Sequence, residues 1–154
     1  MTTPGGNMKI AIVGASFVLL LYLSIPGCAT MSDVLKSKNE GTVQVYRVRA
    51  DRAWDIAVTV LRWEGAETIE EHRKDGYMLT TVGENLVSAG SVVGVWVEPG
   101  NKDNTKVTIV TKRKMQTNIA TGLTESTFHA RFAQAVKIVR SGKPLPLEPP
   151  SSDQ

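Results

Sequence analysis

The residue types that most often carry catalysis are sparse in this chain. Its two histidines, His72 and His129, lie far apart, and neither belongs to an HExxH motif or has a cysteine partner. The sequence has neither a Gly-x-Ser-x-Gly elbow nor a phosphate-cradling glycine loop. His72 lies among charged residues, as is typical of a solvated strand end. His129 lies off the apolar stripe of its helix, so a surface or boundary position is expected. The sequence predicts no catalytic residue and no cofactor.

Three glutamates, Glu67, Glu70 and Glu71, form the other group that could do chemistry, because clustered carboxylates can hold a cation or exchange protons. Glutamates along a strand edge usually bind nothing, so no metal site is predicted. An enzyme that uses Glu67 and Glu70 remains the less favoured hypothesis. It requires both carboxylates to converge in a concave pocket rather than to point outward along a strand.

Two stretches are candidate interaction surfaces. The basic run Lys112, Arg113 and Lys114 could contact anionic headgroups, where each cation contributes about 1 kcal/mol. The alternative is a charged strand end that keeps the edge soluble. The apolar run Val92–Val97 contains Trp96, which would mark a contact patch if one face of the strand is exposed. If both faces are covered, the run is a plain core strand.

Composition restricts the classes of protein further. The 154 residues are 42% hydrophobic and 21% charged, which is typical of one globular domain. A single cysteine excludes a disulfide scaffold and a cysteine-rich metal site. The formal charge is only +3, from 18 basic and 15 acidic residues. This balance gives no electrostatic footprint for nucleic acid, so no nucleic-acid partner is expected.

The most specific signal precedes residue 29. Lys9 is followed by the uncharged run Ile10–Leu23, which is shorter than the roughly 20 apolar residues of a membrane-spanning helix. A positive residue, an apolar run of this length and small residues beyond it are typical of a secretory signal peptide. Either Met1 or Met8 could be the true start, since a lysine directly follows Met8. The only cysteine, Cys28, closes this segment.

The residues Ile25–Cys28 resemble the lipobox of bacterial lipoproteins, with Pro26 where Ala or Ser is more usual. The resemblance implies diacylglyceryl transfer to Cys28, cleavage after Gly27 and acylation of the new terminus. The alternative is an ordinary cysteine beside an uncleaved signal anchor. By resemblance to enterobacterial lipoproteins, Ala29 rather than Asp after the cysteine implies an outer-membrane anchor, although an inner-membrane anchor stays open.

Composition shifts divide the chain into four parts. Residues 1–27 are the expected signal peptide, and residues 28–41 the lipidated cysteine with a polar tether. Residues 42–141 are the folded domain. Residues 142–154 contain four prolines, which favour an extended, solvated tail.

Apolar spacing within residues 42–141 predicts the elements. Residues 42–49 alternate as a strand, with Val43 and Val45 on one face and Tyr46 and Val48 on the other. Asp51 is the expected cap of a helix with an apolar stripe, which ends at Gly65. The stripe consists of Trp54, Ala57, Val58 and Leu61.

Two hairpins and a second helix complete the domain. Residues 67–73 and 77–82 flank the Asp75-Gly76 turn, and residues 92–98 and 106–112 flank a longer loop. The segment Gly83–Ser91 is either loop or strand. The last helix begins near Thr124 or Ser126 and ends at Gly142, with Phe128, Phe132, Ala135, Val136 and Val139 at helical spacing.

The expected fold class is α+β, with an antiparallel sheet of four or five strands and two helices packed on one face, in the order β-α-β-β-β-β-α. The run Val48–Ala57, the Asp75-Gly76 turn and the Phe-containing last helix resemble an uncharacterised family of small bacterial envelope lipoproteins. The arrangement is also similar to the helix-grip domains in the C lipoprotein of the β-barrel assembly machinery. This resemblance covers residues 42–141 and concerns the fold, so it brings no catalytic residue.

Together these features predict a membrane-anchored periplasmic lipoprotein that is a binding or structural accessory module of the cell envelope, not an enzyme. Its expected partners are membrane lipid, through acylated Cys28, and an envelope protein. The alternatives are a carrier of a small ligand or lipid in a helix–sheet cavity, or the carboxylate enzyme.

Overall fold

The computed structural model describes residues 1–2, 29–85, 88–114 and 123–150. Residues 3–27 of the expected signal peptide and Cys28 lie outside the described part of the chain. The elements, in chain order, are helix α1 (Met31–Lys36), the 3₁₀ helix η1 (Lys38–Glu40), β1 (Thr42–Tyr46), α2 (Ala50–Trp63), β2 (Ile69–His72), β3 (Tyr77–Asn85), β4 (Ser88–Pro99), β5 (Thr105–Arg113) and α3 (Glu125–Arg140).

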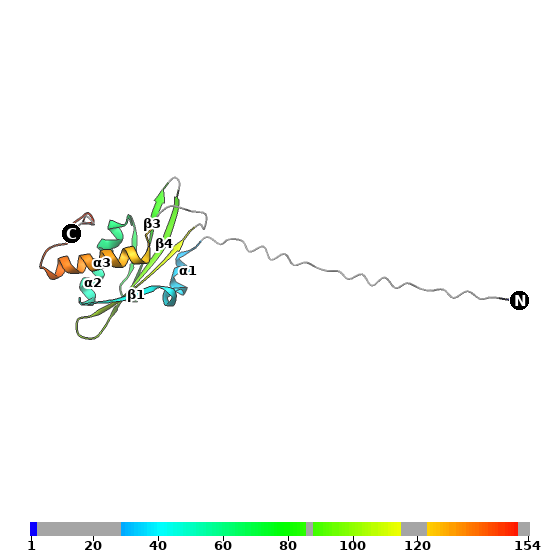
Figure 1. The fold of residues 1–154 in the computed structure, drawn as a ribbon, viewed down its shortest axis with the longest axis horizontal. Helices are drawn as coiled ribbons and strands as arrows, with labels where there is room; N and C mark the ends of the chain where they lie inside the picture. The colour runs from blue at the N-terminus through cyan, green and yellow to red at the C-terminus, as the bar shows by residue number, and fades with distance from the viewer. Residues whose placement is uncertain (3–28, 86–87, 115–122, 151–154) are drawn as a thin grey trace.

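The five strands form one open antiparallel sheet in the order β1-β5-β4-β3-β2. The long helices α2 and α3 pack on one face of this sheet, which we call the inner face (Figure 1). The short helix α1 packs on the other, outer face. The α+β class, the strand count and the two helices on one face are confirmed, and α1 is an addition to the expected order.

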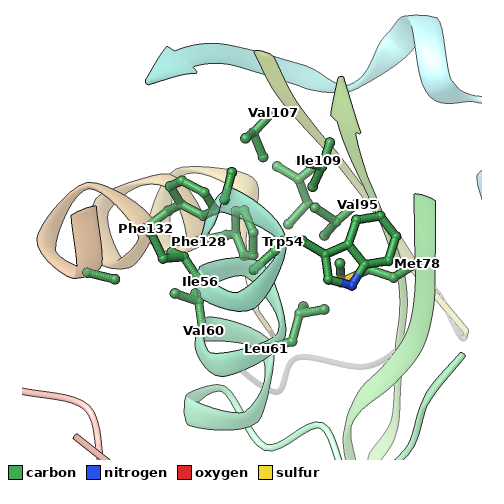
Figure 2. Packing of buried hydrophobic residues seen from close by; sticks show 14 of the residues in the cluster. Trp54, Ile56, Val60, Leu61, Met78, Val95, Val107, Ile109, Phe128 and Phe132 are labelled. Carbon is green, nitrogen blue, oxygen red and sulfur yellow. The ribbon is translucent and has the colours of Figure 1, made fainter. Parts of the chain in front are cut away.

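The main core fills the space between the inner face and the two long helices. Phe128 and Phe132 of α3 are fully buried, and Trp54 of α2 is 5% exposed. Figure 2 shows these rings packed together with Val95 and Ile109 of the sheet. Burial of one such side chain contributes about 1.5–3 kcal/mol, so these contacts dominate the stability of the domain. The expectation that both helices share one core is confirmed.

The start of α2 differs from the expectation. The helix begins at Ala50, and its N-cap is Arg49, whose side chain makes no capping hydrogen bond. Asp51 lies inside the first turn, where a hydrogen bond from the backbone of Arg52 lowers the pKa of its carboxyl group. The prediction that Asp51 is the cap is wrong by two positions, although its charge still complements the helix dipole. Gly65 follows the helix with φ +91°, as expected of a residue that ends it.

Of the tether expected over residues 28–41, the described residues 29–41 are not an extended linker but contain α1 and η1. Thr30 caps α1 and forms a capping box with Asp33. Val34 of α1 is fully buried in a second cluster on the outer face of the sheet. The other buried members of this outer cluster are Leu79, Val92, Trp96 and Val110. The expectation fails because this face of the sheet is apolar, and the preceding chain folds over it.

The strand expected over residues 42–49 is shorter than predicted, because β1 ends at Tyr46 and residues 47–48 form a bend. The expected difference between its two faces is found at four residues. Tyr46 and Val48 are both 8% exposed and join the main core. Val43 and Val45, on the opposite face of the edge strand β1, are 49% and 64% exposed. The outer cluster therefore does not extend onto β1.

Both hairpins are confirmed. Gly76 has φ +73° in the turn between β2 and β3, a backbone conformation that favours glycine. Most of the ambiguous segment Gly83–Ser91 is strand, because the pairing of β3 with β4 continues to Asn85 and Ser88. Residues 86–87, between these two, lie outside the described part of the chain.

The last helix has the expected limits. Thr124 is the N-cap of α3, and its hydroxyl accepts a hydrogen bond from the backbone amide of Thr127 at 3.1 Å. Gly142 follows the C-cap with φ +77°. The proline-containing residues beyond it form no helix, but they are not simply solvated. Leu145 is partly buried and packs against the main core.

Candidate functional site

The lipidation candidate Cys28 lies outside the described residues, but the structure shows how the chain enters the domain directly after it. Thr30 is already the N-cap of α1, and hydrogen bonds from Thr30 lower the pKa of Asp33. Nearby Lys36 and Lys112 lower it further. The entry to the domain therefore lies beside the C-terminal end of β5, where the basic run is found.

The three residues of the basic run differ in their surroundings. Lys112 Nζ lies 2.7 Å from a carboxylate oxygen of Glu40, so this cation is already paired. The side chain of Arg113 is exposed, and Lys114 donates its backbone amide to the carbonyl of Gly90 at 3.1 Å. Arg113 is therefore the member of the run best placed to meet a partner.

Trp96 is not a contact residue. Its side chain is 4% exposed and lies in the outer cluster with Val34. The ammonium group of Lys38 lies over the indole ring, 5.9 Å from its centre. Because α1 and η1 cover this face, the interpretation of Val92–Val97 as a core strand is confirmed, and Trp96 as an interaction residue is wrong.

His129 is buried rather than at the surface, with 2% of its area exposed. Its Nδ1 lies 2.8 Å from the hydroxyl of Tyr46, and its Nε2 lies 3.1 Å from the carbonyl oxygen of Thr42. A carbonyl only accepts, so Nε2 carries the proton of the neutral ring, and Nδ1 accepts from Tyr46. Burial lowers the pKa of His129, which favours this neutral form.

The first turn of α3 links two neighbouring strands of the sheet, β1 and β5. The carboxylate of Glu125 accepts hydrogen bonds from the backbone amides of Thr42 on β1 and Thr111 on β5, at 2.9 and 3.1 Å. Together with His129, this carboxylate ties the edge strand to the helix. Sequence reasoning missed this junction because it depends on contacts between residues far apart in the chain. Its role is structural.

Glu67 and Glu70 line one open pocket of about 360 Å³, beside Met31 of α1. The hypothesis of a carboxylate enzyme required Glu67 and Glu70 to converge in a concave pocket. This requirement is met in part, because both residues line the same pocket. Both side chains are exposed, however, and a carboxylate oxygen of Glu70 lies 3.9 Å from a ring nitrogen of His72. Threonine, leucine and glycine residues also line the pocket. Exposed carboxylates beside such residues are ordinary solvated groups.

His72 lies at the end of β2, where its ring stacks on Tyr77 with centroids 4.5 Å apart. Its side chain is 39% exposed, which fits the expected solvated strand end.

A further polar cluster, absent from the sequence reasoning, lies on the opposite side of β2. The indole N–H of Trp54 donates to the carboxylate of Glu71. The guanidinium of Arg73 lies 5.0 Å from the centre of the Trp54 ring and forms ion pairs with Glu71 and Asp55 at 3.2 and 3.5 Å. The alternation of β2 was the available signal, because it places Glu71 on the face of the sheet that α2 covers. The cluster fixes α2 against the sheet.

Within residues 29–85, 88–114 and 123–150, no three His, Cys, Asp or Glu side chains are grouped so that they could hold a metal ion. In the same part of the chain, no helix has the length and apolar character needed to cross a membrane. No protein-family model matches the sequence, and no curated protein matches it.

Proposed function

We propose that the protein is a periplasmic lipoprotein, anchored in the outer membrane through acylated Cys28, that is a binding or structural accessory module of the cell envelope. Lys9, the uncharged run Ile10–Leu23 and the lipobox-like residues ending at Cys28 support the anchor. A triacylated cysteine exceeds the two hydrophobic chains that stable anchoring needs.

The observation that carries the proposal is the position of α1. Only Cys28, Ala29 and Thr30 separate the proposed acyl chains from the first residue of a helix that packs on the sheet. At no more than ~3.6 Å per residue, this link spans at most about 11 Å. An anchor at Cys28 would thus hold a folded domain directly against the bilayer.

The charges near the entry point suit such a position. Lys36 of α1 and Arg113 at the end of β5 are exposed, and Lys112 is close enough to influence Asp33. Each cation near an anionic surface contributes about 1 kcal/mol. The ion pair with Glu40 reduces the contribution that Lys112 makes to this attraction. The electrostatic contribution is therefore secondary to that of the acyl chains, and it orients the domain.

The packing favours a module over the two alternatives. Phe128, Phe132 and Ile109 fill the space between the helices and the sheet, where a carrier would need a cavity (Figure 2). The carboxylates of Glu67 and Glu70 are exposed, so an enzyme would have to work with ordinary solvated groups. Neither alternative gains support from these contacts.

The anchor is tested by expressing Cys28→Ala in a Gram-negative host with labelled palmitate. The proposal expects an uncleaved precursor that takes up no label, whereas the parent is cleaved and labelled. Arg113→Ala is the matched control and is expected to be processed like the parent. A Cys28→Ala chain with normal processing would show that the lipoprotein interpretation is wrong.

The proposed role as an accessory module is tested separately, by purifying the unsubstituted protein from detergent-solubilised envelopes. A protein recovered in fixed stoichiometry with the parent supports an accessory module. Recovery of the chain with tightly bound lipid and no protein would favour the carrier.

A further inference from the structure

The proline-containing residues 143–150 are held against the two long helices. The indole N–H of Trp63, in the last turn of α2, donates to the carbonyl oxygen of Pro146 at 3.1 Å. The guanidinium Nη1 of Arg131, on α3, donates to the carbonyl oxygen of Pro150 at 2.7 Å. Leu145 lies before them and packs against the core. Three contacts from two helices thus hold this segment, which bends at residues 147 and 148.

Hollows lie along the surface that receives this segment. One, of about 510 Å³, is lined by Arg52, Ile56 and Val139 together with residues 142–145. Another, of about 610 Å³, lies beside Pro150. We call the second hollow, together with Trp63 and the core surface against which Leu145 packs, the helix groove. The α3 residues that line its hollow are Thr127, Ala130, Arg131, Ala133, Gln134, Lys137 and Ile138.

The hydrogen-bonding chemistry of the helix groove matches a proline-rich segment. Proline has no backbone N–H, so such a segment offers carbonyl acceptors at its prolines and no donor there. The indole of Trp63 and the guanidinium of Arg131 only donate. A proline-rich segment is also already extended before it binds, so that little conformational entropy is lost.

The donor on α3 is held in place by α2. A carboxylate oxygen of Glu64, the C-cap residue of α2, lies 3.6 Å from Nε of Arg131. These side chains are 18% and 25% exposed, respectively. Glu64 thus orients the guanidinium from one side and leaves Nη1 to bond the carbonyl of Pro150. Residues of both helices thus position the donor, because Nη1 also lies 3.4 Å from the side-chain oxygen of Gln134 on α3.

The bound tail is held lightly. Leu147, between the two bonded prolines, is 98% exposed, and Pro144, Pro146 and Pro149 are also exposed. A segment with so few buried contacts opens at low free-energy cost. It can therefore leave the helix groove while the core beneath it stays folded.

We propose that the helix groove is a docking site for a proline-rich segment of a partner protein, and that residues 143–150 occupy it in cis when no partner is bound. The proposal is independent of the lipid anchor, because it depends only on α2, α3 and the tail. The partner segment is expected to share the chemistry of the tail. Its proline carbonyls would accept hydrogen bonds from Trp63 and Arg131, and a leucine would lie between two of its prolines.

The test uses a fluorescein-labelled peptide with the sequence of residues 143–154, titrated by fluorescence anisotropy. The receptors are residues 29–154 and the same chain carrying Leu145→Asp, which releases the tail without shortening the protein. The released chain is expected to bind the peptide at least ten-fold more tightly than the parent, because its own tail no longer competes. Circular dichroism confirms that both chains are folded.

Two matched changes locate the site. Trp63→Phe in the released chain removes the indole donor and keeps the ring, so binding should weaken about ten-fold. Trp96→Phe makes the same change in the outer cluster and should leave binding unchanged. A peptide with its four prolines replaced by alanine should bind at least ten-fold more weakly than the parent peptide.

Any of three results would overturn the proposal. The first is that the folded, released chain binds no peptide at millimolar concentration. The second is that parent and released chains bind the peptide equally, and the third is that the alanine peptide binds as tightly as the proline peptide. If Leu145→Asp disturbs the fold, Leu145→Ser provides the released chain instead.

Discussion

The hydroxyl of Tyr46 lies 2.8 Å from Nδ1 of His129, and this contact joins the end of β1 to the first half of α3. The same hydroxyl lies 2.9 Å from the side-chain oxygen of Gln44 and 3.2 Å from the carbonyl of His129. Tyr46 can therefore turn its proton toward either oxygen if Nδ1 becomes protonated. The hydrogen bonds would survive protonation of the ring, but the buried charge would remain unfavourable.

This junction predicts how stability depends on pH. Burial lowers the pKa of His129 in the folded chain below its ordinary value of 6.5, so below that pH the unfolded chain binds more protons. The stability contributed by His129 is complete above about pH 6.5 and is lost as the pH falls toward the lowered pKa. Urea unfolding of residues 29–154 between pH 8 and pH 5 should show this loss.

A histidine variant isolates the effect. His129→Gln cannot titrate, so its free energy of unfolding should fall less steeply over the same interval than that of the parent. Equal slopes for His129→Gln and the parent would contradict the prediction.

The main core predicts a large effect at Phe132. This ring is fully buried and lies 4.5 Å, centroid to centroid, from Tyr46. Phe132→Ala should lower the free energy of unfolding by about 3–5 kcal/mol through lost transfer energy and the cavity left behind. Arg113→Ala removes no core volume and should change it by about 0.5 kcal/mol or less. Urea midpoints that coincide for Phe132→Ala and the parent would refute the two-helix core.

The outer cluster predicts that Gly94 tolerates no side chain. A Cβ at this position would lie 2.5 Å from Cγ1 of Val34 and 2.9 Å from the Trp96 ring. Gly94→Ala should therefore lower the free energy of unfolding by about 1–3 kcal/mol through overpacking. In a double-mutant cycle with Val34→Ala, part of this loss should be recovered, because the smaller residue makes room. If the effects of the two substitutions on the free energy of unfolding are strictly additive, α1 does not pack against Gly94.

The residue after the lipidation candidate predicts where the anchor lies. By the resemblance to enterobacterial lipoproteins, Ala29→Asp should move the chain from the outer to the inner membrane in such a host. Sucrose-gradient fractions of the envelope, probed with an antibody, measure this distribution. Ala29→Ser is the matched control and should remain in the outer-membrane fraction. Outer-membrane recovery of Ala29→Asp would contradict the proposed sorting.

Periodicity found the long elements but not α1. The helices with Trp54 and Phe132 were predictable because each repeats apolar residues over several turns. Helix α1 has six residues and buries only Val34, so it shows no repeat. A local signal was present, since Thr30 and Asp33 have the spacing of a capping box.

The surroundings of single side chains were harder to predict, because they depend on what another part of the chain covers. His129 lies off the Phe128–Phe132 stripe, yet it is buried because the edge strand and Tyr46 pack beside it. Trp96 is buried because α1 and η1 cover the outer face. In both cases the covering element is distant in sequence, and no local pattern of residue types encodes it.

Helix α1 and the C-terminal end of α3, from which the tail begins, lie at opposite ends of the domain (Figure 1). A lipid on Cys28 would therefore give the molecule a proximal pole at the bilayer and a distal pole that displays the tail. A partner bound at the distal pole would be held one domain length away from the lipid surface. The fold would then set a fixed spacing between the membrane and the partner protein that replaces the tail in the helix groove.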